Sequence, residues 1–132
     1  LDTAWLTPRP SPDSTVRSSI AVSADEQVRF FVRLWHGALP VAGRAVELTK
    51  EITFVETSPK GYALHGKTGT GYAGEGTQRR LGWFVGHLAK GDEEYVGVVS
   101  FTDSTDPAPG AKYAGLESRD LFKAIVTEMG HW

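Results

Sequence analysis

The chain contains no cysteine among its 132 residues. It can therefore form no disulfide, no thiolate zinc site and no thiol nucleophile. It also has little net charge, because 14 basic residues nearly balance 16 acidic ones and leave a formal charge of −2. Charges of both signs are mixed along the chain, so the sequence predicts no broad basic surface for nucleic acid or for an anionic membrane.

Long apolar runs are absent as well, and none approaches the length of a membrane span. No basic segment followed by an apolar one marks a signal peptide. The chain begins with Leu1 rather than methionine, which suggests a processed chain or a piece of something longer. Its length fits one domain, and 40% hydrophobic with 23% charged residues is typical of a soluble globular protein.

The first part of the chain indicates a loop followed by helices. Residues 1–22 contain three prolines and several serines, which indicate an irregular, omega-like loop. Helical patterns then occupy residues 23–57. A capping box, Ser23-Ala24-Asp25-Glu26, predicts the start of one helix, and Gly37 predicts its end. A second helix is predicted over about residues 41–55.

The second half predicts a sheet and a closing helix. Three antiparallel strands are predicted within residues 62–102, and the middle one, residues 81–88, is apolar on both faces, as a covered central strand is. A last helix is predicted over residues 117–130, with Ser118 as its N-cap. The order helix, helix, strand, strand, strand, helix predicts an α+β fold, an antiparallel sheet flanked by helices.

One glycine-rich stretch offers a nucleotide-binding interpretation. Residues 61–68 fit the pattern G-x-x-x-x-G-K-T, which cradles phosphates when a helix follows directly. Here Gly69, Gly71, Gly74 and Gly76 follow Thr68 within eight residues, and an ordinary helix does not tolerate so many glycines. A phosphate loop therefore stays a distant alternative.

Two further chemistries find little support in the residue pattern. The four histidines, His36, His65, His87 and His131, have no metal-ligand spacing, so no metal site is predicted. No S-x-x-K sequence provides a serine nucleophile with a lysine base. The chain thus carries no credible nucleophile of its own.

The sequence Lys67-Thr68-Gly69 matches the K-T-G element of serine enzymes that handle penicillins. On a strand, the lysine supplies a positive field for a substrate carboxylate, and Thr68 or Thr70 offers it a hydroxyl. Glycine allows close approach of the backbone. The Thr70 N–H can serve as half of an oxyanion hole. The substrate amide then lies along the strand edge as an added strand would.

Beyond this motif, several stretches resemble one known family. They are Trp5-Leu6, residues 23–30, 39–41, 49–51, 62–71 and 82–86. In these stretches, which come in the family's order, the chain resembles the carboxy-terminal half of a class D (oxacillinase-type) β-lactamase or of the closely similar penicillin-sensor domains. The resemblance covers most of residues 1–102, and the closing helix fits it too. It implies a β-lactamase/transpeptidase-like sandwich.

The resemblance implies roles for individual residues on the predicted strand and in the first loop. Lys67, Thr68 and Gly69 match the K-T-G element, and Thr70 matches the residue whose N–H joins the oxyanion hole. Trp5 matches the omega-loop tryptophan that hydrogen-bonds a carboxylated active-site lysine.

Two more residues are implied by the resemblance. Leu6 matches the apolar residue beside that tryptophan. Arg119 corresponds to the arginine near the start of the last helix that binds the substrate carboxylate. No motif fixes the register before Arg119, so a solvated arginine in the first helical turn is the alternative.

Three elements of the family, S-x-x-K, S-x-V and Y-G-N, are absent from the stretches that match it. The resemblance implies that they precede Leu1, together with the nucleophilic serine and a lysine that becomes carboxylated. We therefore expect a companion amino-terminal segment or chain, and no separate cofactor, metal or nucleic acid.

The implied function is hydrolysis of β-lactam antibiotics through an acyl-enzyme, in a periplasmic, secreted or cell-surface protein. The alternative is a penicillin-sensor or penicillin-binding domain that is acylated and not turned over. Residues 70–77 resemble the Thr-Gly pattern of the sensors more than the bulky-residue pattern of many class D enzymes.

Overall fold

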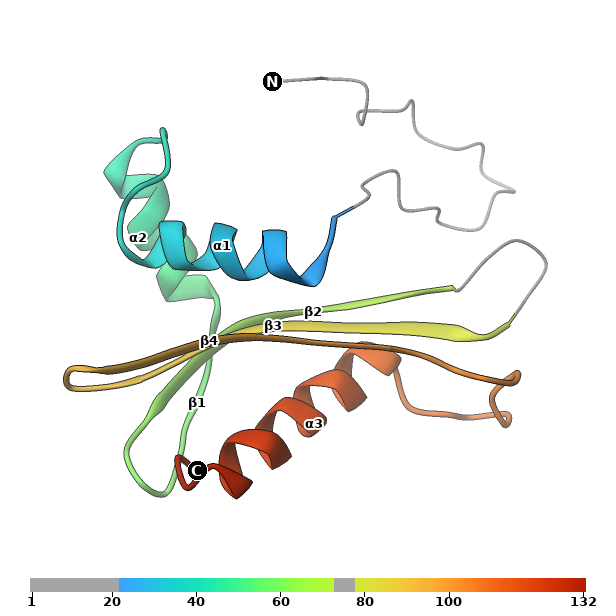
Figure 1. Cartoon of the computed structure of the whole chain (residues 1–132). Coiled ribbons are helices and arrows are strands. Elements are labelled where there is room, and N and C mark those ends of the chain that lie inside the picture. Colours follow the sequence, from blue (N-terminus) through green and yellow to red (C-terminus); the bar gives the residue numbers. More distant parts are fainter. Residues whose placement is uncertain (1–21, 73–77) are drawn as a thin grey trace.

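The computed structural model describes residues 22–72 and 78–132. Its elements are α1 (Ala24–Trp35), α2 (Gly43–Ile52), β1 (Phe54–Thr57), β2 (Ala63–Tyr72), β3 (Arg80–Lys90), β4 (Glu93–Thr102) and α3 (Ala114–Glu128). The strands form one antiparallel sheet in the order β1-β2-β3-β4. Figure 1 shows α1 and α2 on one side of this sheet and α3 across the other. The predicted α+β sandwich is confirmed.

Helix α1 begins at the predicted capping box. The Ser23 hydroxyl accepts a hydrogen bond from the Glu26 N–H, and the Glu26 carboxylate accepts one from the Ser23 N–H. These bonds satisfy two of the backbone groups that a helix start leaves unpaired. The backbone bond with Ser23 also holds the pKa of Glu26 below its usual value. The helix ends before Gly37, whose φ of 66° suits glycine.

The predicted second helix is too long, and the sheet has one more strand than predicted. Helix α2 ends at Ile52, and residues 54–57 form β1 beside β2. The side chain of Thr53 bonds to the Thr49 carbonyl, and its own carbonyl accepts from the Gly66 N–H of β2. Phe54, Val55 and Thr57 favour a strand once this tertiary partner is available.

The start of the last helix also differs from the prediction. Helix α3 begins at Ala114, four residues before Ser118, and its N-cap Tyr113 provides no side-chain hydrogen bond. Ser118 is fully buried in the face that packs on the sheet, so it is not a cap. The helix starts early because Ala114 and Gly115 are small enough to pack directly on the strands.

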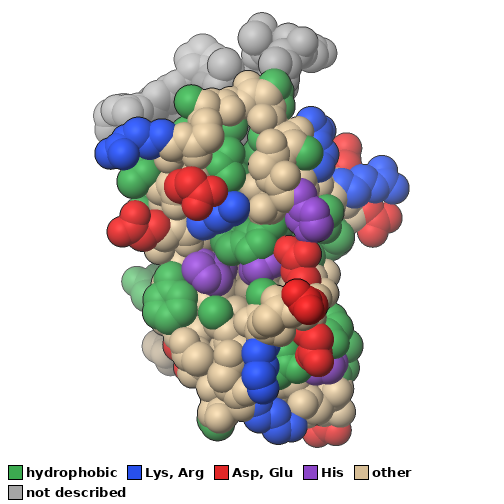
Figure 2. Space-filling view, turned by 90° about the vertical axis from the view of Figure 1, so that its left-hand side faces the viewer, with side chains coloured by type: hydrophobic (Ala, Val, Ile, Leu, Met, Phe, Trp, Pro, Cys, Tyr) green, Lys and Arg blue, Asp and Glu red, His purple; other side chains and the backbone are tan. Residues whose placement is uncertain are grey.

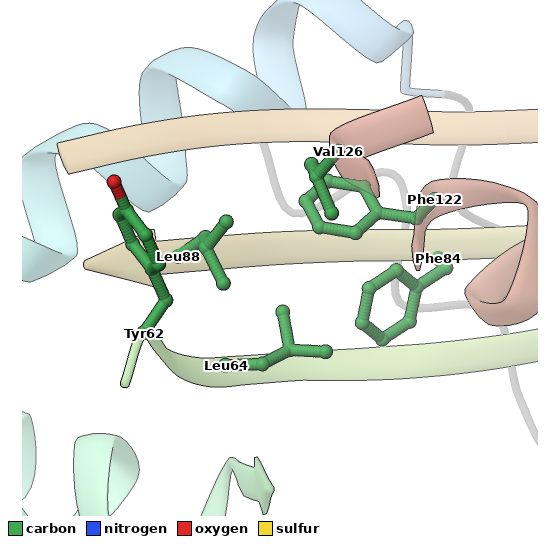
Figure 3. Close-up of a cluster of buried hydrophobic side chains, with 6 residues drawn as sticks. All are labelled: Tyr62, Leu64, Phe84, Leu88, Phe122 and Val126. Atoms are coloured by element: carbon green, nitrogen blue, oxygen red, sulfur yellow. The ribbon is translucent and has the colours of Figure 1, made fainter. Parts of the chain in front are cut away.

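The core lies on both faces of β3. On the α3 side, six side chains point toward one another, as Figure 3 shows: Tyr62, Leu64, Phe84, Leu88, Phe122 and Val126. A second cluster lies beneath α1 and consists of Phe31, Leu34, Val46 and Val85. Two-sided burial explains the apolar sequence of β3, and its predicted central place is confirmed.

No helix within residues 22–72 and 78–132 has the length and apolar character needed to cross a membrane. The omega-like loop predicted for residues 1–22 falls, except for Val22, outside the described residues.

Candidate functional site

The K-T-G residues lie in β2, at a point where one edge of that strand is open. β1 pairs with β2 only as far as His65, and the Gly66 N–H donates to the Thr53 carbonyl over 2.8 Å. Beyond Gly66, no strand among the described residues pairs with this side of β2. We call residues 67–72 on this side the open edge. Because peptide groups alternate along a strand, those of Thr68 and Thr70 point to the same edge as that of Gly66.

Lys67 brings its ammonium group to the open edge. Its side chain is exposed, and its Nζ donates to the Thr68 carbonyl over 2.6 Å. Side chains alternate along β2, so Thr68 and Thr70 share the α3 face with buried Leu64, and Lys67 leaves from the opposite face. The edge therefore combines a positive charge with backbone groups that have no strand partner in the described part of the chain.

Thr70 connects this edge to helix α3. Its Oγ1 accepts a hydrogen bond of 2.9 Å from the Gly115 N–H. A Cβ added to Gly115 would lie only 2.7 Å from the Gly69 carbonyl oxygen, so the helix backbone sits directly on the strand. At Gly69 itself an added Cβ would come no closer than 3.4 Å to Trp83. Of the two glycines at this contact, Gly115 and not Gly69 is the one that the packing requires.

Arg119 lies on the side of α3 that faces β1 and β2. Lys123, one helical turn further on, reaches Glu56 of β1 with 2.8 Å between Nζ and Oε1. Residues four apart share a helix face, so Arg119 lies above the part of β2 that follows the β1 pairing. Its Nη2 donates to Asp120 over 3.2 Å. Arg119 thus lies on the same helix face as Lys123, while its guanidinium bonds to its own neighbour.

Arg80 holds the loop before α3 and was not identified from the sequence. Its guanidinium contacts Asp103 at 2.8 Å and Glu117 at 3.0 Å, and it also donates to the Lys112 carbonyl. Hydrogen bonds to Asp103 and Glu117 raise the pKa of Arg80, and the bond from Arg80 lowers the pKa of Asp103. The three partners are 23 to 37 residues away in sequence, so no local pattern reveals this network.

The α1 side of the sheet carries a histidine cluster beneath the end of α1. His87 and His36 each contact Glu94, at 2.7 and 2.8 Å, and the Trp35 ring lies 4.0 Å from that of His87. Figure 2 shows histidine, acidic and hydrophobic side chains close together in the middle of this part of the surface. No group of three histidine, aspartate or glutamate side chains in the described ranges is arranged to hold a metal ion.

His87 is buried in this cluster with 2% of its surface exposed. Burial lowers its pKa more than the hydrogen bond to Glu94 raises it. Its Nδ1 is buried without a hydrogen-bond partner, so a second ring proton there would have no acceptor. The ring is therefore neutral at pH 7, with Nε2–H donating to Glu94.

The remaining predictions about the site have different outcomes. Trp5 and Leu6 lie outside the described residues. The nucleotide-loop alternative is wrong, because Lys67 and Thr68 lie inside β2, which continues to Tyr72 where a phosphate loop needs a helix.

Comparison with known proteins identifies the family and agrees with the fold. Residues 7–127 match the family described as penicillin binding protein transpeptidase domain. Beta-lactamase OXA-1 from Escherichia coli is 32% identical over 91 residues, which are 68% of this chain and 33% of that protein. The crystal structure of the class D β-lactamase OXA-427 superimposes with a TM-score of 0.70 and 32% identity, covering 85% of this chain and 46% of that one.

A penicillin receptor shares the fold. The carboxy-terminal domain of the Bacillus licheniformis BlaR penicillin-receptor superimposes with a TM-score of 0.72 at 23% identity, covering 86% of this chain and 43% of that domain. At this identity the likeness concerns the fold alone. The chain spans about a third of the length of the curated relatives it matches, and less than half of each of these two solved structures.

Proposed function

Because this chain belongs to the penicillin-binding transpeptidase family, we propose that it is the K-T-G part of a class D-type serine domain that β-lactams acylate. The acylated serine lies outside residues 1–132. The observation that carries this proposal is the open edge of β2, where Lys67 Nζ and the backbone groups of Thr68 and Thr70 lie together. A β-lactam amide pairs with this edge as an added strand, and its carboxylate meets the ammonium group.

Each residue of the edge has a chemical task. Lys67 supplies the positive field for the substrate carboxylate and for the proton of the neighbouring serine. The Thr68 hydroxyl binds the same carboxylate. The Thr70 N–H is half of the oxyanion hole, where a fixed donor stabilises the charge that develops on the β-lactam carbonyl. Gly69 keeps the backbone accessible to the substrate.

Arg119 is the second cation for the substrate carboxylate. Its place on the β1–β2 side of α3 supports this role, since Lys123 on the same face reaches Glu56. To act, its guanidinium exchanges Asp120 for the substrate, and that surface pair offers little resistance because exposed ion pairs contribute about 0–1 kcal/mol. For Trp5 and Leu6 we propose the loop that supports the carboxylated lysine.

A companion amino-terminal segment completes the sheet. β4 is an edge strand of 10 residues with no neighbour beyond it among the described elements. Beside it, Leu121, Ile125 and Met129 form an exposed apolar stripe on α3, and an open groove of about 450 Å³ lined by Phe101, Glu117, Asp120 and Leu121 separates helix from strand. A long apolar edge and an exposed helix face are features that proteins normally cover.

The companion segment supplies the serine, the carboxylated lysine and the cover for β4. The chain matches about a third of the length of its relative OXA-1, and a companion segment is consistent with the remaining length. The acylated domain acts on β-lactams outside the cytoplasm, in the periplasm or at the cell surface, where these compounds meet their targets.

Two outcomes of acylation are compatible with the edge. A β-lactamase hydrolyses the acyl-enzyme, whereas a penicillin sensor keeps it. The Thr-Gly pattern after K-T-G is the reason to include the sensor, and the hydrolase is supported by the relatives above 30% identity. Rapid mixing with nitrocefin separates the two: steady turnover identifies the hydrolase, and a single burst identifies the sensor.

The test of the proposal is covalent labelling of the full-length protein that carries this chain. A fluorescent penicillin is expected to label it, and Lys67→Ala is expected to slow labelling by about 10-fold to 100-fold, the range for a lost charge-assisted hydrogen bond. Lys60→Ala is the matched control, because this exposed lysine bonds to the Gly130 carbonyl at the other end of the sheet. Absence of labelling in the wild type would refute the proposed function.

A further inference from the structure

We propose that the Thr70 side chain is a positioning group, which fixes the oxyanion N–H of its own backbone and the carboxylate-binding Arg119 relative to each other. This inference rests on the proposed function and adds to it. Thr70 joins the two parts because its backbone belongs to the open edge and its hydroxyl holds the first turn of α3.

The hydroxyl of Thr70 caps a helix that lacks a cap of its own. Tyr113 precedes α3 without any side-chain hydrogen bond to the helix. The N–H of Gly115, in the first turn, is one of the four donors that a helix start leaves without an intrahelical acceptor. Thr70 Oγ1 accepts it over 2.9 Å from a different element. The cap of α3 is therefore tertiary, and it comes from the residue after K-T-G.

Close packing prevents the first turn from sliding along the strands. A Cβ on Gly115 would lie 2.7 Å from the Gly69 oxygen and 3.0 Å from Thr70 Oγ1. A Cβ on Gly82 of β3 would lie 2.6 Å from the Ala114 oxygen. Helix and strand backbones thus touch at two points, and a displacement of the helix start displaces the K-T-G backbone with it.

Arg80 of β3 also binds the first turn of α3. It pairs with Tyr72 in the register of β2 and β3, and its guanidinium binds Glu117 in the first turn of α3. The helix start is therefore held between Thr70 on β2 and Arg80 on β3. Of these two, only Thr70 also contributes a backbone N–H to the open edge.

The position of the first turn of α3 sets the distance between Arg119 and the Thr70 N–H. Arg119 follows Gly115 by one helical turn and lies on the face of α3 toward β2. If the Thr70 hydroxyl is removed, α3 loses its cap, and Arg119 is held less firmly relative to the Thr70 N–H, by the packing at Gly115 and by Arg80 alone. A misplacement of about 1 Å at a reaction site can reduce the rate by about 100-fold.

The experiment compares Thr70→Val and Thr70→Ser in the full-length protein that carries this chain. Valine has nearly the shape of threonine but accepts no hydrogen bond, whereas serine keeps the hydroxyl. The readout is the second-order rate constant of acylation by a penicillin, measured on folded protein well below the melting temperature. Thr70→Val should lower it by about 10-fold to 100-fold, and Thr70→Ser should recover most of the loss.

Val126→Ala separates positioning from general destabilisation. Val126 is buried in the core on the same helix, near its far end, and touches no group of the open edge. Its truncation should lower the melting temperature while acylation of the folded protein stays within about twofold. If Thr70→Val fails to fold, Thr70→Ala repeats the loss of the acceptor without adding a methyl group.

A double variant tests the link to Arg119. If Thr70 positions Arg119, Thr70→Val combined with Arg119→Ala should lose less than the product of the two single effects, because neighbouring groups that act together are not additive. If the double variant loses the full product of the two single effects, Thr70 does not act through Arg119. Acylation by Thr70→Val at the wild-type rate would overturn the positioning role, as would a loss no larger than that of an equally destabilised Val126→Ala.

These outcomes are distinct from failure of the proposed function. If the wild-type protein is not acylated at all, the proposed function fails, and the positioning role fails with it. If the wild type is acylated and only the variant pattern differs from expectation, the proposed function stands and the positioning role alone is refuted.

Discussion

Lys123 of α3 and Glu56 of β1 form an ion pair, with Nζ and Oε1 2.8 Å apart. Their contact shows which side of α3 faces β1. Arg119, one turn earlier, lies on the same side of the helix, whereas Glu117, Asp120 and Leu121 lie toward Arg80 or toward the groove beside β4. The pair thus identifies the face of α3 that carries Arg119, for which the sequence has no motif.

Arg119→Ala should weaken acylation by β-lactams that carry a carboxylate. A hydrogen bond to a charged group contributes about 1.5–3 kcal/mol, so we expect the acylation rate constant of the full-length protein to fall by about 10-fold to 100-fold. The measurement is stopped-flow acylation at two salt concentrations.

The control for this variant is Lys123→Ala, which removes a cation from the same helix face but leaves Arg119. Because an exposed ion pair contributes about 0–1 kcal/mol, its effect on acylation should stay within a few-fold. If Arg119→Ala changes the rate no more than Lys123→Ala does, Arg119 is a solvated arginine.

Gly66→Ala should destabilise the protein far more than Gly71→Ala, although both lie on β2. A Cβ at Gly66 would lie 2.4 Å from the Phe84 ring and 2.6 Å from the Val85 oxygen, and backbone cannot give way as a flexible side chain can. At Gly71 an added Cβ meets nothing within 4 Å. Overpacking typically costs about 1–3 kcal/mol.

The check is urea unfolding of both variants beside the wild type. Gly66→Ala is expected to shift the midpoint by an amount that corresponds to about 1–3 kcal/mol, with Gly71→Ala close to the wild type. Equal stability of the two variants would show that β2 does not pack on β3 at Gly66 as described.

His87 should make the protein less stable as the pH falls through about 6.5, the ordinary value of a histidine pKa. Burial lowers the pKa of His87 in the folded state, so below pH 7 the unfolded chain binds a proton that the folded protein does not. The free energy of unfolding therefore falls with falling pH, by up to about 1.4 kcal/mol per unit for one proton.

His87→Gln, which retains a donor for Glu94, should flatten the stability profile between pH 7.5 and about 5.5, the range around the histidine pKa. At lower pH the free energy of unfolding also depends on Glu94, because the pKa of this carboxyl is lowered. Burial raises the pKa of Glu94, but the hydrogen bonds from His36 and His87 lower it by more. The comparison is His131→Gln, which keeps the cluster intact. A profile for His87→Gln as steep as that of His131→Gln would contradict the assignment.

Local signals in the sequence predicted most of the elements. The capping box at Ser23 and Glu26 acts within four residues, and the two-sided apolar pattern of β3 depends only on burial, so both could be recognised without a structure. The K-T-G motif was recognised in the same way, and its place on a strand is confirmed.

Long-range contacts account for the errors. β1 forms because the Thr53 carbonyl accepts a hydrogen bond from the Gly66 N–H. Helix α3 begins early because the Gly115 N–H donates to the Thr70 hydroxyl. Neither partner is near in sequence, so propensity alone favoured a longer second helix and Ser118 as a cap. Arg80 was missed for the same reason, although a glycine in the first turn of a helix could have drawn attention to Gly115.

The most direct test of the central claim is an intact-mass spectrum of the native, full-length sample before and after a penicillin, followed by peptide mapping. We predict an adduct with the mass of the drug on a serine outside residues 1–132, in a segment or chain that accompanies β4. An adduct on a residue within 1–132, or no adduct on any companion polypeptide, would contradict it.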